Sequence, residues 1–207
     1  MPLHAGLTGP VPEGSDPEEY DRLRRRVLWS MPTGLFVVGS RFGDERNLMT
    51  CNWVMQVATT PKLVTVAIEV GSVTHRLIDE GGGFGVSILA RADRGLVRRF
   101  VKPASDVVID ADGVATAIQG ETVHEVAHGL PVLASAVGWL ACRVRQSVSL
   151  ASHAAELASH AAELASHTVF VGEVVDAGEA PVVVGDEGGQ RHPEVLRMED
   201  TRMNYGG

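Results

Sequence analysis

Residues 47–78 read NLMTCNWVMQVATTPKLVTVAIEVGSVTHRLI. Its apolar runs are rich in Val, Ile and Thr, have the length of strands and end at polar or proline-containing links, so we expect strands at 47–58 and 63–70. A helix should follow over the residues THRLIDE, because Ser72 can cap its first turn and the three glycines 81–83 end it. This part of the chain therefore predicts strands followed by a short helix.

The same pattern of short apolar runs and turn-forming links continues along the chain. Further runs of strand length, separated by Gly, Asp or Pro, lie at 35–40, 84–90, 139–148 and 168–177. A second short helix is expected at 92–100, before Pro103, and no element is assigned to 105–130. Because so few helices interrupt the strands, the pattern favours a closed or nearly closed sheet over alternating parallel units.

The beginning of the chain differs from this pattern. Residues 1–16 are rich in Gly and Pro with little to bury, and we expect a flexible arm. A helix should begin at Pro17 behind a Ser15 or Asp16 cap, with Tyr20, Leu23 and Val27 on one face. Its arginines (Arg22, Arg24, Arg25 and Arg26) are expected on a solvated face. The remainder, 17–207, is expected to form one domain.

Composition narrows the classes of protein. The 207 residues carry 18 Lys and Arg against 26 Asp and Glu, a net charge of −8, which disfavours binding to nucleic acid or to an anionic membrane. Cys51 and Cys142 lack the spacing of a zinc site or a disulfide framework, so we expect reduced thiols. With no apolar run approaching roughly 18 residues and no signal-peptide pattern, the expected location is the cytoplasm.

A tandem repeat interrupts the last strands. The heptad ASHAAEL at 151–157 recurs at 158–164, and its apolar spacing predicts a helical insertion at about 150–166. Two heptads are marginal alone in water, so the helix should pack on its own domain or on a partner chain. The repeat also places a stripe of side chains able to bind a metal, but duplication alone accounts for them, and no metal site is expected. The stripe consists of His153, Glu156, His160, Glu163 and His167.

Two segments carry candidate binding chemistry. Thr50, Cys51 and Asn52 place small hydrogen-bonding groups beside large apolar ones, which suits a planar heterocycle such as a flavin; the alternative is an ordinary strand with one polar face. The helix start at 72–76 offers backbone amides, two hydroxyls and a cation for a phosphate. Its candidate ligands are Ser72, Thr74, His75 and Arg76, although Ser72 could simply cap the helix while Arg76 faces water.

His167 is the third candidate. It stands at the start of the strand TVFVGEV, where a lone histidine is often structural or exposed. Beside a redox ring, however, it could position a nicotinamide or donate a hydrogen bond.

In their order, these segments resemble the flavin reductase-like family of FMN-binding split barrels. The similar stretches are NLMTCN at 47–52, TPKLVTVAI at 60–68, SVTHRLI at 72–78, FGVSIL at 84–89, RRF at 98–100, LPVLASAVGWLAC at 130–142, ASHTVFVGEV at 165–174 and the terminal MNYGG. The resemblance implies a mainly β fold: a six-stranded Greek-key split barrel with flanking α-helices. In this chain the barrel would also carry the inserted heptads.

The resemblance also implies a function. A member of this family would transfer hydride from NADH or NADPH to FMN or FAD, as a homodimer with flavin at the interface, and could supply reduced flavin to an oxygenase. The phosphate would lie at the helix start, the ring edge at 50–52, and the nicotinamide beside His167. Ser87, in place of the family's usual Asn, also belongs to the implied cofactor-binding set.

The chain departs from the family pattern at several positions. Cys51 and Asn52 stand where Ala and Ser are usual, and Ala165 and Ser166 replace the Gly and Asp before His167. Because the presumed nicotinamide side has changed, the alternative function is an FMN-binding carrier or store, in which the inserted helix blocks access of the nicotinamide. A further alternative makes the heptad insertion an assembly device.

Overall fold

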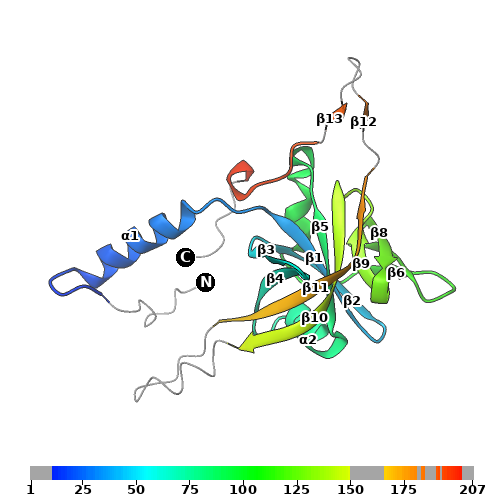
Figure 1. Cartoon of the computed structure of the whole chain (residues 1–207), viewed down its shortest axis with the longest axis horizontal. Coiled ribbons are helices and arrows are strands. Elements are labelled where there is room, and N and C mark those ends of the chain that lie inside the picture. Colours follow the sequence, from blue (N-terminus) through cyan, green and yellow to red (C-terminus); the bar gives the residue numbers. More distant parts are fainter. Residues whose placement is uncertain (1–10, 150–165, 181–182, 185–189, 192, 202–207) are drawn as a thin grey trace.

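The computed structural model describes residues 11–149, 166–180, 183–184, 190–191 and 193–201. These residues form antiparallel sheets with two α-helices and short 3₁₀ turns (Figure 1). The elements are α1 (Pro17–Trp29), β1 (Phe36–Phe42), β2 (Glu45–Cys51), β3 (Val54–Thr59), β4 (Lys62–Glu69), α2 (Val73–Gly81), β5 (Gly83–Ile88), η1 (Arg91–Asp93), η2 (Leu96–Phe100), β6 (Val107–Ile109), β7 (Ala115–Ile118), β8 (Glu121–Val126), η3 (Ala127–Gly129), β9 (Leu130–Leu133), β10 (Gly138–Ser149), β11 (His167–Glu179), β12 (Val183–Val184), β13 (Gln190–Arg191) and η4 (Met198–Asp200).

The main sheet has seven strands in the order β2-β1-β5-β10-β11-β4-β3. Its two edge strands, β2 and β3, follow each other in the chain and are separated only by Asn52 and Trp53. Such a short link can join opposite edges only if the sheet curls until they almost meet. The sheet is therefore an open barrel, split at the β2–β3 corner.

The expected mainly β split-barrel architecture is confirmed, with two differences in detail. The stretch 47–58 contains two strands rather than one, because the chain turns at Asn52 and Trp53 from one edge of the sheet to the other. For this reason the sheet has seven strands instead of six. The barrel is open because its two edge strands, β2 and β3, do not pair with each other.

One hydrophobic core fills the barrel. Side chains from six strands and from α2 meet there, and the largest that are fully buried are Phe84, Phe170, Ile68 and Ile78. In β4 the buried residues alternate with half-buried ones, as the period of a strand requires. The alternation sends Val64, Val66 and Ile68 inward and leaves the intervening side chains on the outer surface of the barrel.

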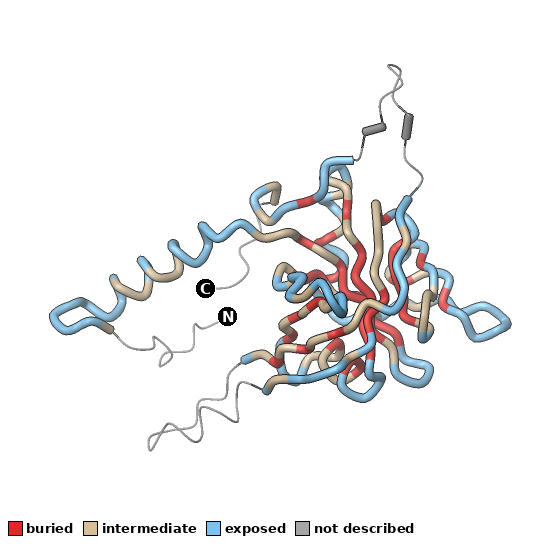
Figure 2. The backbone as a smooth tube through the Cα atoms, in the orientation of Figure 1, coloured by how far each residue is buried: buried red, intermediate tan, exposed pale blue. Residues whose placement is uncertain are grey.

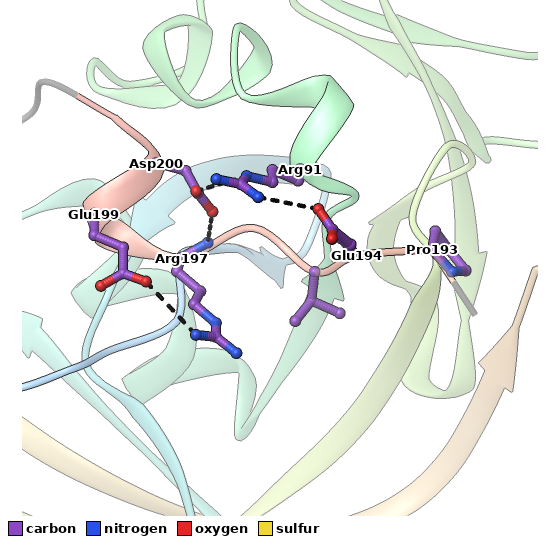
Figure 3. Close-up of a pocket in the computed structure, with 7 residues that line it drawn as sticks. Arg91, Pro193, Glu194, Arg197, Glu199 and Asp200 are labelled. Carbon is purple, nitrogen blue, oxygen red and sulfur yellow. Dashed lines mark hydrogen bonds and ion pairs between the residues drawn. The ribbon is translucent and has the colours of Figure 1, made fainter. Parts of the chain in front are cut away.

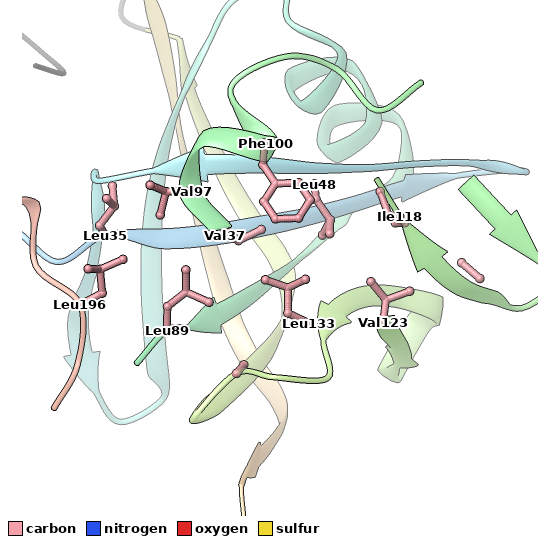
Figure 4. Close-up of a cluster of buried hydrophobic side chains, with 12 residues drawn as sticks. Leu35, Val37, Leu48, Leu89, Val97, Phe100, Ile118, Val123, Leu133 and Leu196 are labelled. Carbon is pink, nitrogen blue, oxygen red and sulfur yellow. The ribbon is translucent and has the colours of Figure 1, made fainter. Parts of the chain in front are cut away.

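A second core lies on the outer face of β1, β2 and β5. Here η2, the C-terminal segment (193–201) and the four-stranded sheet β6-β7-β8-β9 cover the barrel. Figure 4 shows Phe100 beside Leu48 in this core and Leu196 beside Leu35 and Leu89. The layers come very close at Gly39, where an added Cβ would lie 1.8 Å from the carbonyl oxygen of Pro131. Glycine at this position is therefore required by packing.

The segment 105–130, to which the sequence analysis assigned no element, contributes most of this covering sheet. Its turns are marked by Gly113 and Gly120, both at positive φ, a local signal that could have revealed the hairpins. The helix expected at 92–100 is instead two 3₁₀ turns, η1 and η2, separated by Arg94 and Gly95.

An ion pair between Arg46 and Glu125 joins the two sheets. The two side chains are only 1% and 6% exposed, and Arg46 Nε lies 2.6 Å from Glu125 Oε1. Arg46 also donates to the carbonyl of Gly113, while Glu125 accepts from the amide of Ala115 and from Arg41. Every polar end of this buried pair is thus satisfied, as burial of charge demands.

The helix α1 begins at Pro17 behind the Asp16 cap, as expected, but it does not pack in either core. Figures 1 and 2 show it extending from the barrel, with exposed and half-buried residues along its whole length. The predicted apolar face is therefore largely exposed: Leu23 is 45% and Val27 58% accessible.

Some predictions fall outside the described residues: the tip of the N-terminal arm (1–10), the heptad helix with its histidines and glutamates (150–165), and the terminal MNYGG. Both cysteines are free thiols, as predicted, and both are buried. Within the described ranges, no helix has the length and apolarity needed to cross a membrane.

Candidate functional site

Three segments meet at the β2–β3 corner where the barrel is split. The carbonyl of Trp53 accepts a hydrogen bond from the amide of Ala67 in β4 (3.1 Å). The amide of Val70, just past the end of β4, donates to the carbonyl of Ser166 before β11 (2.9 Å). The corner therefore combines the β2–β3 link, the β4–α2 turn and the start of β11.

The β4–α2 turn presents a helix start to this corner. Gly71 takes φ +80°, which lets the chain reverse direction, and the side chain of Ser72 accepts a hydrogen bond from the amide of His75 (3.1 Å). The first amides of α2, those of Val73 and Thr74, have no carbonyl one turn earlier to bond. Ser72 is thus a helix cap, and the amides beside it suit an anion.

His75 is fixed by contacts across the corner. Its Nε2 lies 2.9 Å from the Thr168 hydroxyl, and its ring centroid is 5.4 Å from that of Phe170. Both partners belong to β11, so this histidine fastens α2 to the strand. Its ring is positioned within the protein, and its amide belongs to the helix start.

His167 opens β11 and faces the β2–β3 link. Its Nδ1 lies 2.7 Å from the Ser166 hydroxyl, and its ring meets Trp53 edge to face, with centroids 4.7 Å apart and planes at 72°. Partial burial lowers the pKa of His167 below its usual value, while the nearby carboxylate of Glu69 acts in the opposite direction. The shift favours the neutral form of the imidazole.

Two candidate residues for the flavin ring edge, Cys51 and Asn52, lie in different surroundings. The Cys51 thiol faces the barrel core, where burial raises its pKa to about 11, against a smaller lowering by a hydrogen bond from the backbone of Trp53. Asn52 is half-buried and its side chain makes no hydrogen bond within the described chain. Asn52 thus brings a free amide group to the corner, whereas Cys51 contributes its backbone.

Thr50 and Ser87 lie on the other face of the sheet. The Thr50 hydroxyl donates to the carbonyl of Val97 (2.6 Å), and the Ser87 hydroxyl accepts from the amide of Leu133 (2.9 Å). Both flank Val37 in the strand register and are buried against the second core. Their hydroxyls already have partners there, so a role toward a ligand stays a prediction.

Thr74 and Arg76 also have protein partners. The buried Thr74 hydroxyl accepts from the Asn47 side chain (2.8 Å), whose oxygen accepts from the amide of Ala104. Arg76 pairs with Glu45 and with Glu80 on the surface, and these partners raise its pKa above the usual value, the Glu45 hydrogen bond most. Its guanidinium would have to leave a carboxylate to bind a phosphate.

Two residues that complete the corner, Trp53 and Thr168, were not among the candidates predicted from the sequence. Trp53 was included in an uninterrupted strand, and its position at the link depends on strand order rather than on local pattern. Thr168 directly follows His167, and the alternation of a strand turns it inward, toward His75. That alternation is a local signal that could have found it.

A separate pocket of about 390 Å³ lies between η1 and the C-terminal segment (Figure 3). Each of its arginines is paired: Arg91 with Glu194 (3.0 Å) and Asp200 (2.7 Å), and Arg197 with Glu199 (3.5 Å). The two pairs of Arg91 fasten the C-terminal segment to η1. Together with the pair of Arg197, they leave no cation here for an anionic ligand, and the corner remains the candidate site.

Metal ligands are not grouped at the corner. Across the part of the chain that the structure describes, no three His, Cys, Asp or Glu side chains gather as a metal site would require. The histidines of the heptads lie outside that part.

The fold and the corner define an antiparallel split-barrel domain with a capped helix start beside the opening of the barrel. Residues 28–189 match the family described as flavin reductase like domain, and the chain belongs to that family.

Two relatives illustrate the similarity in sequence. The NADH-dependent flavin reductase StyB of Pseudomonas fluorescens is 29% identical over 130 residues, which are 62% of this chain and 69% of the relative. The high molecular weight rubredoxin of Moorella thermoacetica is 25% identical over 154 residues, 73% of this chain and 58% of the relative. Against the diflavin flavoproteins of Synechocystis sp., the chain spans only 23% and 21% of their length.

The fold is also found in a solved structure. The NADH:FAD oxidoreductase SgcE6 of Streptomyces globisporus C-1027 superposes with a TM-score of 0.58 at 28% identity, covering 83% of this chain and 84% of that one. Its complex with NAD and FAD fragments gives 0.56 at 27% identity, with coverage of 82% and 88%.

Proposed function

We propose that this protein is an NAD(P)H-dependent flavin reductase that binds FMN or FAD at the β2–β3 corner. The observation that carries the proposal is the meeting of a helix start, the free amide of Asn52 and the Trp53–His167 pair at one opening of the barrel. Family membership and the activities named for StyB and SgcE6 support it. The free cysteines are compatible with the reducing cytoplasm, where we place the activity.

The chemistry of the corner fits a flavin. A phosphate needs donors, which the α2 amides and the Ser72 hydroxyl supply without desolvating a buried charge. A flavin ring needs hydrogen bonds along one edge and apolar contact on its faces. Asn52 and the backbone of the link offer the first, and Trp53, 40% exposed, offers the second.

These positions suggest a separate role for each residue of the corner. A bound flavin would accept hydride from the nicotinamide, and the protein supplies position and electrostatics. Ser72 holds the helix start through the amide of His75, and Thr168 holds the His75 ring. His167, neutral and oriented by Ser166, would border the nicotinamide and offer a hydrogen bond without adding a charge.

Thr50, Thr74 and Ser87 would support the site without contacting the flavin. Their hydroxyls hold Val97, Asn47 and Leu133, and so fix the strands and the helix that carry the ligand-facing groups. Arg76 would bind the phosphate only after its guanidinium leaves the carboxylates of Glu45 and Glu80. Cys51 would contribute its backbone.

A homodimer with flavin at the interface is part of the proposal. On the outer face of the sheet, Met55, Thr65 and Val171 form one cross-strand row, and Ala67 and Val169 form another. Met55 is 64% exposed, while the other four are only half-buried. A sheet that is apolar on both faces needs cover on both. A second copy would supply that cover beside the corner, and a partner oxygenase would receive the reduced flavin.

The test is anaerobic reduction of flavin by NADH and by NADPH, followed by absorbance. The wild type should bind FMN or FAD and bleach it, and His167→Ala should slow bleaching by about tenfold, a loss of about 1.4 kcal/mol of transition-state positioning, without weakening flavin affinity. His124→Ala, an exposed histidine of β8, is the matched control and should behave as the wild type.

The outcomes separate the two candidate functions. Flavin bound tightly but never bleached would replace the reductase with the FMN carrier. No binding to either flavin by the wild type would remove both.

A further inference from the structure

The segment 94–105 concentrates positive charge. It contains three arginines and one lysine but no acidic residue, in a chain whose net charge is −8. Arg99 pairs with Glu121 (3.2 Å). The other three cations have exposed side chains with no ion pair or hydrogen bond among the described residues: Arg94, Arg98 and Lys102. Cations without partners are available to an anion.

Two hydrogen bonds tie the ends of the stretch 97–104 to β2. The carbonyl of Val97 accepts from the Thr50 hydroxyl (2.6 Å), and the amide of Ala104 donates to the Asn47 side chain (2.7 Å). Thr50 and Asn47 are three residues apart on β2, so their side chains lie on opposite faces of the sheet. One edge of β2 is paired with β1, and a stretch bonded on both faces therefore passes around the free edge. This free edge borders the split of the barrel.

Asn47 also joins this stretch to the proposed phosphate site. Its amide nitrogen donates to Thr74 Oγ1 (2.8 Å) in the first turn of α2. One side chain therefore spans the gap between Ala104 and the helix start. Lys102 is two residues from Ala104, which places the two Cα atoms within about 7 Å of each other. Lys102 thus lies next to the helix start, and Arg98 lies further along the same stretch.

The packing of η2 holds Arg98 outward. Val97 and Phe100 are buried in the second core (Figure 4), so the residues between them face solvent. Arg76, on α2 itself, would have to leave two carboxylates to bind a phosphate, whereas Arg98 and Lys102 would leave none. In the described part of the chain, these two residues are therefore the cations beside the helix start that an anion can bind without competition.

We propose that Lys102 and Arg98 bind the second phosphate of flavin adenine dinucleotide, and so make FAD rather than FMN the preferred flavin. The inference rests on the proposed function, in which the first phosphate lies at the start of α2. In FAD the two phosphates share a bridging oxygen, so the second must lie directly beside the first. FMN has one phosphate, which the helix start already takes, and gains much less from two further cations. NADH and NADPH also contain a pyrophosphate, but their nicotinamide is placed beside His167 rather than at the helix start.

The test is calorimetric titration of the full-length chain with FAD, FMN and riboflavin. The wild type should bind FAD at least about tenfold more tightly than FMN. Arg98→Gln with Lys102→Gln should raise the dissociation constant of FAD by about tenfold and that of FMN by less than about threefold, because only FAD carries the second phosphate. Lys62→Gln removes the other lysine of the chain, at the end of β4 away from the corner, and is the matched control that should change neither. Both variants should keep the thermal midpoint of the wild type, because the replaced side chains are exposed.

Steady-state reduction shows which dinucleotide supplies the phosphate. The double variant should raise the KM for FAD by about tenfold and leave kcat and the KM for NADH or NADPH unchanged. The inference is overturned if the wild type binds FAD and FMN equally, if the double variant weakens both flavins alike, or if only the KM for the nicotinamide rises. Each of these results leaves the proposed function standing. A wild type that binds none of the three flavins would remove the proposed function, and this inference with it.

Discussion

At the residue scale, His167 couples the corner to pH. Burial lowers its pKa in the folded state below the value of about 6.5 that applies when the chain is unfolded. Between these two values the unfolded state binds more protons, so the free energy of unfolding should fall as the pH drops below about 6.5. Well above pH 7, from about pH 8, the ring is neutral in both states and contributes no slope.

Replacing His167 by Gln should remove this dependence. The difference in free energy of unfolding between the wild type and His167→Gln, measured in urea, should be constant above about pH 8 and shift against the wild type below about 6.5. His124→Gln serves as the exposed control. A difference that stays flat down to pH 5 would contradict the burial of His167 described for the corner.

At the scale of elements, the start of α2 has two separable roles. Asp caps a helix about as well as Ser, so Ser72→Asp should leave the midpoint of thermal unfolding nearly unchanged. The added carboxylate would lie among the amides proposed for the phosphate, and FMN should bind at least about tenfold more weakly while riboflavin, which lacks the phosphate, is little affected.

Ser72→Ala is the companion variant. It removes the cap, costs about 1 kcal/mol of stability and leaves the anion site uncharged. Fluorescence titration with both flavins decides the matter: an equal loss for FMN and riboflavin in Ser72→Asp would place the phosphate elsewhere.

Elements with local signals could be predicted from the sequence. Both helices begin at the expected caps, Asp16 and Ser72, and α2 ends at Gly82 in the left-handed conformation. The break between β2 and β3 could not be predicted, because a single Asn beside a Trp is a weak turn signal and the break follows from which strands pair. The same holds for the site: the segments were found, but which side chains face the corner depends on nonlocal register.

At the scale of the whole molecule, the buried ion pair between Arg46 and Glu125 joins the barrel to the covering sheet β6-β7-β8-β9. Glu125→Gln removes the charge that compensates a buried guanidinium, and should lower the free energy of unfolding by about 3 kcal/mol. Glu18→Gln, in the exposed pair with Arg22, should change it by less than about 0.5 kcal/mol. Urea unfolding of both variants provides the measurement, and equal small effects would show that the two sheets are held by their apolar contacts alone.

The order of strands has a consequence for synthesis on the ribosome. The β1–β2–β5 half and the β3–β4 half of the sheet are joined only through β10 and β11, which the ribosome makes last among the strands of the sheet. At 5–20 residues per second, translation from the end of β5 to the end of β11 takes on the order of 5 to 20 s. Throughout that interval the nascent chain carries two unpaired strand edges, on β5 and on β4, each a template for pairing with a neighbouring chain. The yield of this protein in a cell should therefore depend on how well chaperones shield the emerging polypeptide.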